Sequence, residues 1–235
     1  SFMAQLEGSA NTFQVPATTA TQTGPATATW AMDGTGVVTN YCLYSEQFDN
    51  AAWGSLSGGT ATANTAVAPD GTTTADTINC AVVYRGLGQP TALAATVGAT
   101  YTFSVYLAGT VGQTCRIRVA NTTGTVTAAT TDVTLTAAFA RYSATVTLAG
   151  GATGVMDCWV AREAGQTAAS FYAWGAQLEL AAAASTYVRT TSATATSLAA
   201  FKVTGLTVSS TNMTAGQMLT IDGRLHILTA DVVAD

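Results

Sequence analysis

Charged side chains are scarce in this sequence of 235 residues. They make up 9% of the chain, Lys202 is the single lysine, and the formal net charge is −5. Electrostatic binding of nucleic acid needs a surplus of basic residues, so this function is excluded. Hydrophobic residues make up 48% of the chain, a fraction that excludes the disordered class. No apolar run approaches the roughly 20 residues of a membrane-spanning helix, so membrane insertion is not expected.

Cysteine is also sparse, with four copies at Cys42, Cys80, Cys115 and Cys158. This number is too low for a disulfide-scaffold protein of this length, and no two cysteines form a CxxC pair. A tetrahedral zinc site would require all four to converge from separate strands. The alternative is that they are small, buried, reduced thiols in a protein assembled in a reducing compartment.

Alanine and threonine are the residues in excess, with 46 and 45 copies. Threonine, valine and glycine recur too often for a long stable helix. The only candidates for helix are a turn near residues 46–53 and the alanine run 181–184, and the alternative for that run is a linker or turn, because it is too short to be helical alone. In residues 101–107 and 142–148 apolar side chains occupy every second position, and in 115–119 both even positions are arginine. Such alternation is typical of antiparallel strands with one face on a core.

Turn residues such as Pro69-Asp70-Gly71 and Gly150-Gly151 separate these alternating segments. Strands at this spacing predict an all-β fold, an antiparallel β-sandwich of the jelly-roll type. Trp174 alternates in phase with Tyr172 and Leu178, so we expect its ring in the core between two sheets.

Two stretches rich in alanine and threonine interrupt the strand rhythm and divide the chain into three parts. Residues 1–36 form an N-terminal segment and linker, residues 37–190 a sandwich domain, and residues 191–235 a linker and C-terminal segment. Asp222-Gly223 lies between two alternating runs and predicts a tight hairpin. We expect the first and third parts to form a small flanking β region, and the sequence to be a piece of a longer chain.

The central part resembles the jelly-roll, carbohydrate-binding-module-like domains that are common in bacteriophage structural proteins. The segments that carry the resemblance are NYCLYSEQFDNAAW (40–53), APDGTTTAD (68–76), YTFSVYL (101–107), RYS (141–143), WGAQLE (174–179) and TYV (186–188). The resemblance implies a virion component, often of tail or fibre, that is assembled in the bacterial cytoplasm and has a glycan-facing role. It does not fix a ligand.

The ends of the chain carry a second resemblance. Residues 2–13 and 215–231 resemble two segments of a phage tail-tip structural domain. This resemblance implies that the central part is inserted into a tail scaffold, as in the enlarged distal tail proteins of long-tailed phages, whose inserted modules bind host glycans. The partners it implies are other virion proteins, copies of the chain in a homo-oligomeric ring, and a host surface polysaccharide.

A structural calcium ion is the one cofactor for which the resemblance suggests ligands, because many jelly rolls of this type hold one near the first and last strands. The oxygen candidates are Glu46, Asp70, Asp76 and Glu179. Calcium takes six to eight oxygens, and these carboxylates do not form a loop motif. The alternative to a calcium-binding role is that Asp70 stabilises a turn and Glu46 caps one.

The candidate glycan site follows from strand alternation. Arg116 and Arg118 share one face of their strand, and Asp157 and Trp159 share the outward face of another. If the two strands belong to one sheet, these four side chains form a patch with one aromatic platform. Sugars present apolar C–H faces to aromatic rings and hydroxyl edges to planar polar groups. The alternative is an interface for another protein, because tryptophan and arginine are also typical of binding hot spots.

Catalysis is not expected. No GxSxG nucleophile motif occurs, so the single histidine, His226, has no recognisable serine partner. Glycosidases need two carboxylates that face each other across a cleft, and the few acids here mostly adjoin turn residues. There is no P-loop or dinucleotide fingerprint.

Three hypotheses therefore remain. The first is a tail or tail-tip protein of a bacteriophage virion whose inserted module binds host glycans. The second is a purely structural virion protein, a capsid decoration, collar or head-to-tail component that makes only protein contacts. The third, and least favoured, is an enzyme that degrades a surface polysaccharide.

Overall fold

The computed structural model describes residues 38–197 throughout and, in the flanking segments, the backbone of short strands. The chain divides into two compact units, a central unit of Val38–Ser197 and a flanking unit of Ser1–Val37 with Leu198–Asp235. Residues 46–53 and 181–184 form turns and bends, without a helix. In the part of the chain that is described, no helix has the length and apolarity to cross a membrane.

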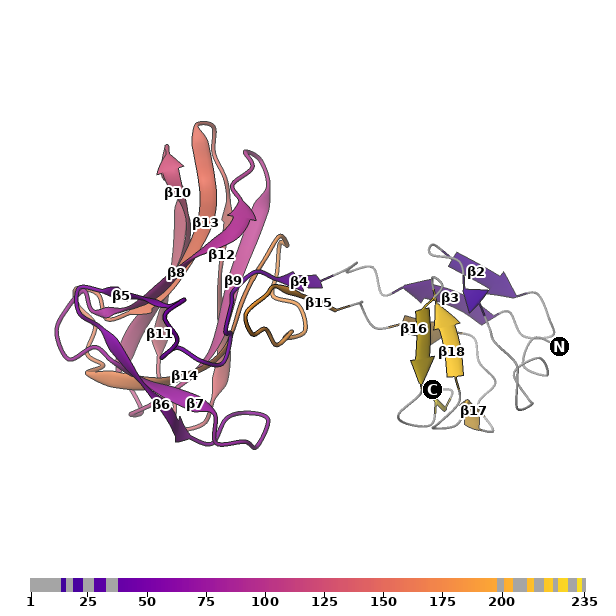
Figure 1. Ribbon diagram of the computed structural model, residues 1–235, viewed down its shortest axis with the longest axis horizontal. Coiled ribbons are helices and arrows are strands. Elements are labelled where there is room, and N and C mark those ends of the chain that lie inside the picture. Colours follow the sequence, from indigo (N-terminus) through magenta and orange to yellow (C-terminus); the bar gives the residue numbers. More distant parts are fainter. Residues whose placement is uncertain are drawn as a thin grey trace. The chain divides into compact units, whose positions relative to one another are not determined.

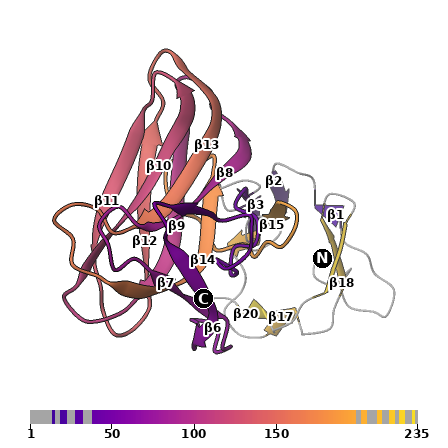
Figure 2. The same ribbon diagram turned by 60° about the vertical axis from the view of Figure 1, so that its left-hand side comes forward.

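The central unit consists of two five-stranded antiparallel sheets, which can be followed in Figures 1 and 2. The β10–β13 sheet has the order β11 (Ala128–Thr134), β10 (Thr114–Gly124), β13 (Ala152–Ala161), β8 (Gly86–Ala94), β5 (Gly54–Leu56). The β9–β14 sheet has the order β12 (Ala140–Thr147), β9 (Thr100–Ala108), β14 (Ser170–Glu179), β7 (Ala75–Asn79), β6 (Thr60–Ala66). The predicted all-β jelly-roll sandwich is confirmed.

The core between the sheets is formed by the inward residues of the alternating strands. Cys115, Ile117 and Val119 of β10 are fully buried, whereas Arg116 and Arg118 between them face outward. Both sheets supply such residues, because successive side chains along a strand point alternately into the core and away from it. The largest fully buried apolar side chains are Tyr101, Phe48, Phe103, Phe171, Ile78, Leu107, Ile117, Leu135, Met156 and Leu178.

Strand β14 departs from the predicted alternation at Gly175. Its pairing with β9 shifts between Trp174 and Gln177, and Gly175 has a positive φ of 64°. This bulge reverses the phase of the strand. Ala173 therefore faces the core before the bulge, and Ala176 faces it afterwards. The expectation for Trp174 was wrong, because its ring lies in a separate aromatic cluster outside the inter-sheet core.

Part of the outer face of the β9–β14 sheet, the face away from the core, is covered by residues 181–191 around Thr102, Trp174 and Gln177. Tyr187 packs against Trp174 with ring centroids 4.9 Å apart. Thr102 donates a hydrogen bond to the carbonyl of Ala181, and Gln177 donates one to the carbonyl of Thr186. This cover explains why Thr102 and Gln177 are fully buried although their side chains point away from the core.

The two ends of the central unit pair with each other. Strands β4 (Val38–Asn40) and β15 (Ala195–Ser197) are antiparallel, with Thr39 opposite Thr196. The central unit thus extends past the expected boundary at residue 190. The Asn40 amide fixes this region, because its Nδ2 donates to the carbonyls of Ala176 and Val188 and its Oδ1 accepts from two backbone amides.

The flanking unit contains short strands from both ends of the chain. Strand β3 (Ala28–Met32) pairs with β2 (Thr19–Gln22) and with β16 (Phe201–Thr204). Strands β18 (Met218–Ile221) and β19 (Arg224–Ile227) form the predicted hairpin, and β1 (Gln14–Val15) pairs with β18. Strands β17 (Thr211–Met213) and β20 (Val232–Val233) also pair. The side chain of His226 lies outside the described residues.

Candidate functional site

The four residues that were predicted to form a patch lie on neighbouring strands of one sheet. Strands β10 and β13 are antiparallel, with Arg118 opposite Trp159 and Arg116 opposite Ala161. Asp157 precedes Trp159 by two positions, so it lies on the same outer face. All four side chains are partly exposed.

Arg118 and Trp159 form the centre of this face. The guanidinium carbon of Arg118 lies 5.5 Å from the centroid of the Trp159 ring, a cation–π contact. The stacked guanidinium limits the motion of the indole and leaves donors at its own edge. The pair therefore presents an apolar platform beside a fixed hydrogen-bond donor.

Two polar atoms at this face lack hydrogen-bond partners. Among the described residues, three buried side-chain atoms have none, and they are Arg118 Nε, Arg141 Nε and Asp157 Oδ1. Arg118 and Asp157 flank Trp159 on the outer face of the β10–β13 sheet. Folded proteins satisfy nearly all buried polar groups with protein, water or ligand partners, so this donor and this acceptor mark a place beside Trp159 where a further partner would bind.

Asp157 is held in an environment that disfavours its charge. Burial raises the pKa of this carboxyl, and the nearby guanidinium of Arg118 lowers it by a smaller amount. A carboxylate that is desolvated without a protein donor on Oδ1 is costly for folding. A carboxyl that is perturbed by burial beside a charged partner is a candidate functional position.

Unlike Arg118, Arg116 already has a hydrogen-bond partner within the protein for its guanidinium. Its Nε and Nη2 donate to the two carboxylate oxygens of Asp132, at 2.6 and 3.1 Å. Asp132 lies opposite Arg116 on β11 and also accepts a hydrogen bond from Gln166. Arg116 lowers the pKa of Asp132 by this hydrogen bond. Arg116 thus belongs to an exposed ion pair at the margin of the site, and Arg118 is the arginine free for a ligand.

Glycines provide space on the other side of Trp159. Gly88 of β8 lies opposite Trp159, and Gly54 of β5 lies opposite Gly88. A Cβ at Gly88 would lie 3.0 Å from the Cβ of Trp159, whereas a Cβ at Gly54 would meet only a carbonyl oxygen at 3.6 Å. Beside the indole the sheet therefore forms a shelf of two glycines, bordered by Leu56, whose Cδ1 lies 3.6 Å from the position of a Cβ at Gly88. A flat ligand could rest on this shelf against the indole.

Sequence reasoning found the four patch residues but missed the shelf and the partner of Arg116. Gly54 and Gly88 carry no chemical signal of their own, and only the strand register aligns them with Trp159. The position of Asp132 opposite Arg116 likewise depends on strand register, here the pairing of β10 with β11. The alternation of β11 places Asp132 outward, but no sequence feature identifies its partner strand.

The carboxylates that were expected as calcium ligands are bound by other protein groups. Asp76 accepts backbone hydrogen bonds from Phe48, Asp49 and Asn64, so it ties β7 to two neighbouring segments. Asp70 accepts from the backbone and hydroxyl of Thr72, as the turn alternative predicts. Asp76 thus faces amide donors, which suit an anion and repel a cation.

The remaining two carboxylates are also engaged. Glu46 accepts a hydrogen bond from the Tyr187 hydroxyl and forms an ion pair with Arg189 at 2.9 Å. Glu179 accepts from the side chain of Gln177 and from the backbone and hydroxyl of Ser185. The four carboxylates are not brought together, and within residues 38–197 no group of three histidine, cysteine or acidic side chains is placed to hold a metal ion.

The four cysteines are free thiols in the interior. Burial raises the pKa of Cys80 to about 11 and that of Cys115 to about 12. The sulfur atoms of Cys42 and Cys158 lie 3.5 Å apart. The alternative of buried reduced thiols therefore describes this structure, in which the cysteines form no zinc set.

No model of a known protein family matches the sequence, and no curated protein matches it. Solved structures with a similar fold include the CBM22-1–GH10 modules of Clostridium thermocellum xylanase Xyn10B in complex with xylohexaose, with a TM-score of 0.46 and 14% identity. The match covers 63% of this chain and 29% of that one. The C-terminal family 22 carbohydrate-binding module of the same enzyme has a TM-score of 0.46 and 16% identity, and it is covered over 96% of its length.

A second kind of neighbour is the enzymatically active domain of tailspike protein 4 of bacteriophage CBA120, with a TM-score of 0.45 and 14% identity. That match covers 60% of this chain and 21% of the tailspike chain. The protein thus spans less than a third of the xylanase fragment and of the tailspike domain. Likeness at this level of identity concerns the fold, a jelly-roll β-sandwich, and the chemistry of the site follows from its own side chains.

Proposed function

We propose that the central unit binds a saccharide at the outer-face site, defined as Arg118, Asp157 and Trp159. The observation that carries the proposal is the pair of buried unpaired atoms, Arg118 Nε and Asp157 Oδ1, beside one partly exposed tryptophan. A sugar ring stacks its C–H face on the side of the indole toward Gly88, since Arg118 lies over the ring from the β10 side. Its hydroxyl groups then accept a hydrogen bond from Arg118 and donate one to Asp157.

The local charge favours a saccharide without a net charge. Arg116 is neutralised by Asp132, and Arg118 lies close enough to Asp157 to lower the pKa of that carboxyl. A neutral hydroxyl-rich ligand satisfies a donor and an acceptor at once. The proposed role is binding, and we assign no catalytic residue.

We further propose that this unit is a host-recognition module of a bacteriophage virion, in its tail or tail tip. Support comes from the pairing of β4 with β15, which brings the two ends of the central unit together as an inserted module requires. Strands from both ends of the chain also share the sheets of the flanking unit. The partners in this proposal are other virion proteins, further copies of the chain and a host surface polysaccharide.

The test is a glycan array that displays neutral and acidic oligosaccharides, probed with the whole chain and with a Trp159→Ala variant. The proposal predicts a hit that the variant loses while its circular dichroism and melting temperature stay unchanged. Equal signals from both proteins would contradict the assignment of the site. Release of reducing ends from a bound polysaccharide would contradict the purely binding role.

The competing role is a protein contact at the same face, because arginine and tryptophan also dominate interface hot spots. Particle reconstruction distinguishes the two. Trp159 facing solvent in the assembled particle agrees with glycan binding, whereas Trp159 buried against another subunit supports the purely structural role.

A further inference from the structure

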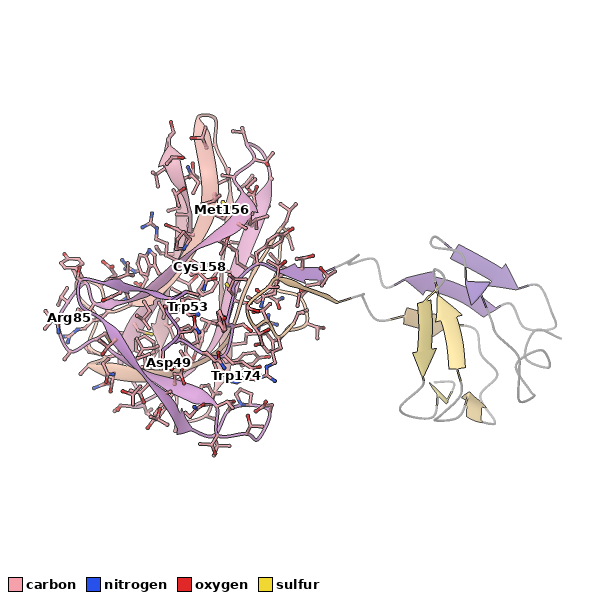
Figure 3. All side chains as sticks on the ribbon, viewed as in Figure 1. Asp49, Trp53, Arg85, Met156, Cys158 and Trp174 are labelled. Atoms are coloured by element: carbon pink, nitrogen blue, oxygen red, sulfur yellow. The ribbon has the colours of Figure 1, made fainter. Side chains whose placement is uncertain are left out.

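A pair of buried cysteines carries chemistry that saccharide binding does not use. The sulfur atoms of Cys42 and Cys158 lie 3.5 Å apart, and both side chains are fully buried. Cys42 follows β4, and Cys158 lies in the middle of β13, where Figure 3 labels it. We propose that these two residues form an oxidisable pair that closes into a disulfide bond between β13 and the segment after β4.

The backbone on both sides of the pair is already fixed. The amide of Cys42 donates to the side chain of Asn40, and its carbonyl accepts from the hydroxyl of Thr190. Cys158 lies within the ladder of β13, opposite Val119 on one side and Gln89 on the other. A disulfide has an S–S distance of about 2.05 Å, so the sulfurs would have to approach by about 1.5 Å through rotation about the cysteine side-chain bonds.

The oxidant that the reaction needs is a small disulfide such as glutathione disulfide. One cysteine thiolate attacks a glutathione sulfur and forms a mixed disulfide, and the first glutathione leaves as a thiolate that takes up a proton. The second cysteine thiolate then attacks the protein sulfur of this mixed disulfide and expels the other glutathione. Two protein thiols are oxidised to one disulfide, and one glutathione disulfide is reduced to two glutathione molecules.

The closed fold slows this exchange. Burial, and then the contact with Cys42, raise the pKa of Cys158 well above its usual value, so its reactive thiolate is rare. We therefore expect the bond to form during folding, or through local opening of the sandwich in an oxidising medium. The fully folded protein should react slowly.

The bond would join residues 116 positions apart in the sequence. A loop of this length restricts the unfolded chain strongly, so the bond should raise the melting temperature by about 10 °C. It would also anchor β13, the strand that carries Asp157 and Trp159. Cys80 and Cys115 provide an internal reference. They are close enough for Cys80 to raise the pKa of Cys115, but the Cys80 thiol donates to the carbonyl of Ala168.

The experiment refolds the whole chain in a glutathione redox buffer and, in parallel, with excess reductant. Free thiols are alkylated under denaturing conditions, and the digest is mapped by mass spectrometry without reduction. We expect a peptide that links Cys42 to Cys158, with Cys80 and Cys115 alkylated, and a melting temperature about 10 °C above that of the reduced sample. Alkylated Cys42 and Cys158 after oxidation, or a link from either to another cysteine, would overturn the proposal.

Two variants sharpen the result. A chain with Cys80→Ala and Cys115→Ala should keep the link and the gain in melting temperature. Cys42→Ala should abolish both, with its reduced and oxidised samples melting together. If a variant does not fold, the peptide map of the native chain still decides the outcome.

Discussion

The guanidinium of Arg118 stacks over the indole of Trp159, with 5.5 Å between its central carbon and the ring centroid. The two residues face each other across β10 and β13, on the side away from the core. Arg118 Nε and Asp157 Oδ1 are both buried without a hydrogen-bond partner in the protein. One sheet face thus holds a platform, a donor and an acceptor, the three elements of saccharide recognition.

Arg118 and Arg116 should respond differently to truncation. Arg118→Ala removes the unpaired donor and should weaken saccharide binding about 10- to 100-fold, the effect of a charge-assisted hydrogen bond. Arg116→Ala removes a residue that already pairs with Asp132, so affinity should change by less than about threefold, as expected for an exposed ion pair. Calorimetric titration with the best array glycan measures both. Equal losses in the two variants would show that the pairing of Arg116 does not matter.

Gly54→Val tests the shelf beside Trp159. A Cβ at Gly54 meets only a carbonyl oxygen at 3.6 Å, and valine favours strands, so the fold should be as stable as before or slightly more stable. The new side chain occupies the space next to the indole and should weaken binding at least about tenfold, since about 1.4 kcal/mol corresponds to this factor. Gly150→Val is the control, because a Cβ there has open space around it. Unchanged affinity of the Gly54 variant would place the ligand elsewhere.

Asp157→Asn should stabilise the protein and impair its function. Burial raises the pKa of Asp157 in the folded chain, so the folded state holds this proton more tightly than the unfolded state. Ionisation of Asp157 therefore lowers the free energy of unfolding as the pH rises above about 4. At pH 7 the variant should melt about 2–4 °C higher than the native chain, a shift typical of about 1 kcal/mol. At pH 3 the variant and the native chain should melt at the same temperature.

The same variant should bind the saccharide more weakly, because the amide replaces the charged acceptor. Melting curves at the two pH values and a binding titration give both results. A variant that melts lower than the native chain at pH 7 would contradict the view that Asp157 is retained for a ligand.

Gly175→Ala tests the bulge that turns Trp174 away from the core. The positive φ of 64° disfavours any residue with a Cβ, and the added atom would lie 3.1 Å from Cδ2 of Tyr106. We expect the free energy of unfolding to fall by about 1–2 kcal/mol, measured by urea denaturation. Binding at the outer-face site, on the other sheet, should not change. An alanine variant as stable as the native chain would show that the bulge is not required.

Strand alternation in the sequence predicts much of the sandwich, because each strand has one face on the core. The rule succeeds for β10, where the arginines and the apolar residues alternate without interruption. It fails in β14, because the bulge at Gly175 changes the phase within one strand. The sequence Trp174-Gly175-Ala176 does not show whether the glycine continues a regular strand or forms a β-bulge.

The candidate site was predictable only in part. The outward phase of Arg118 and Trp159 follows from their own strands, but their contact depends on the pairing of β10 with β13. The neutralisation of Arg116 depends on β11, and the shelf depends on β8 and β5. These are long-range registers, which period-two patterns do not specify. The association with a virion stays a prediction.

The most direct test of the saccharide site compares two aromatic residues on the outer faces of opposite sheets. Trp159→Ala removes the proposed platform, and Tyr172→Ala removes a partly exposed ring on β14. Calorimetric titration with the best array glycan should show a loss of about 30-fold or more for Trp159→Ala, the effect of a hot-spot residue, and no change for Tyr172→Ala. A Trp159 variant that folds normally and keeps native affinity would contradict the account.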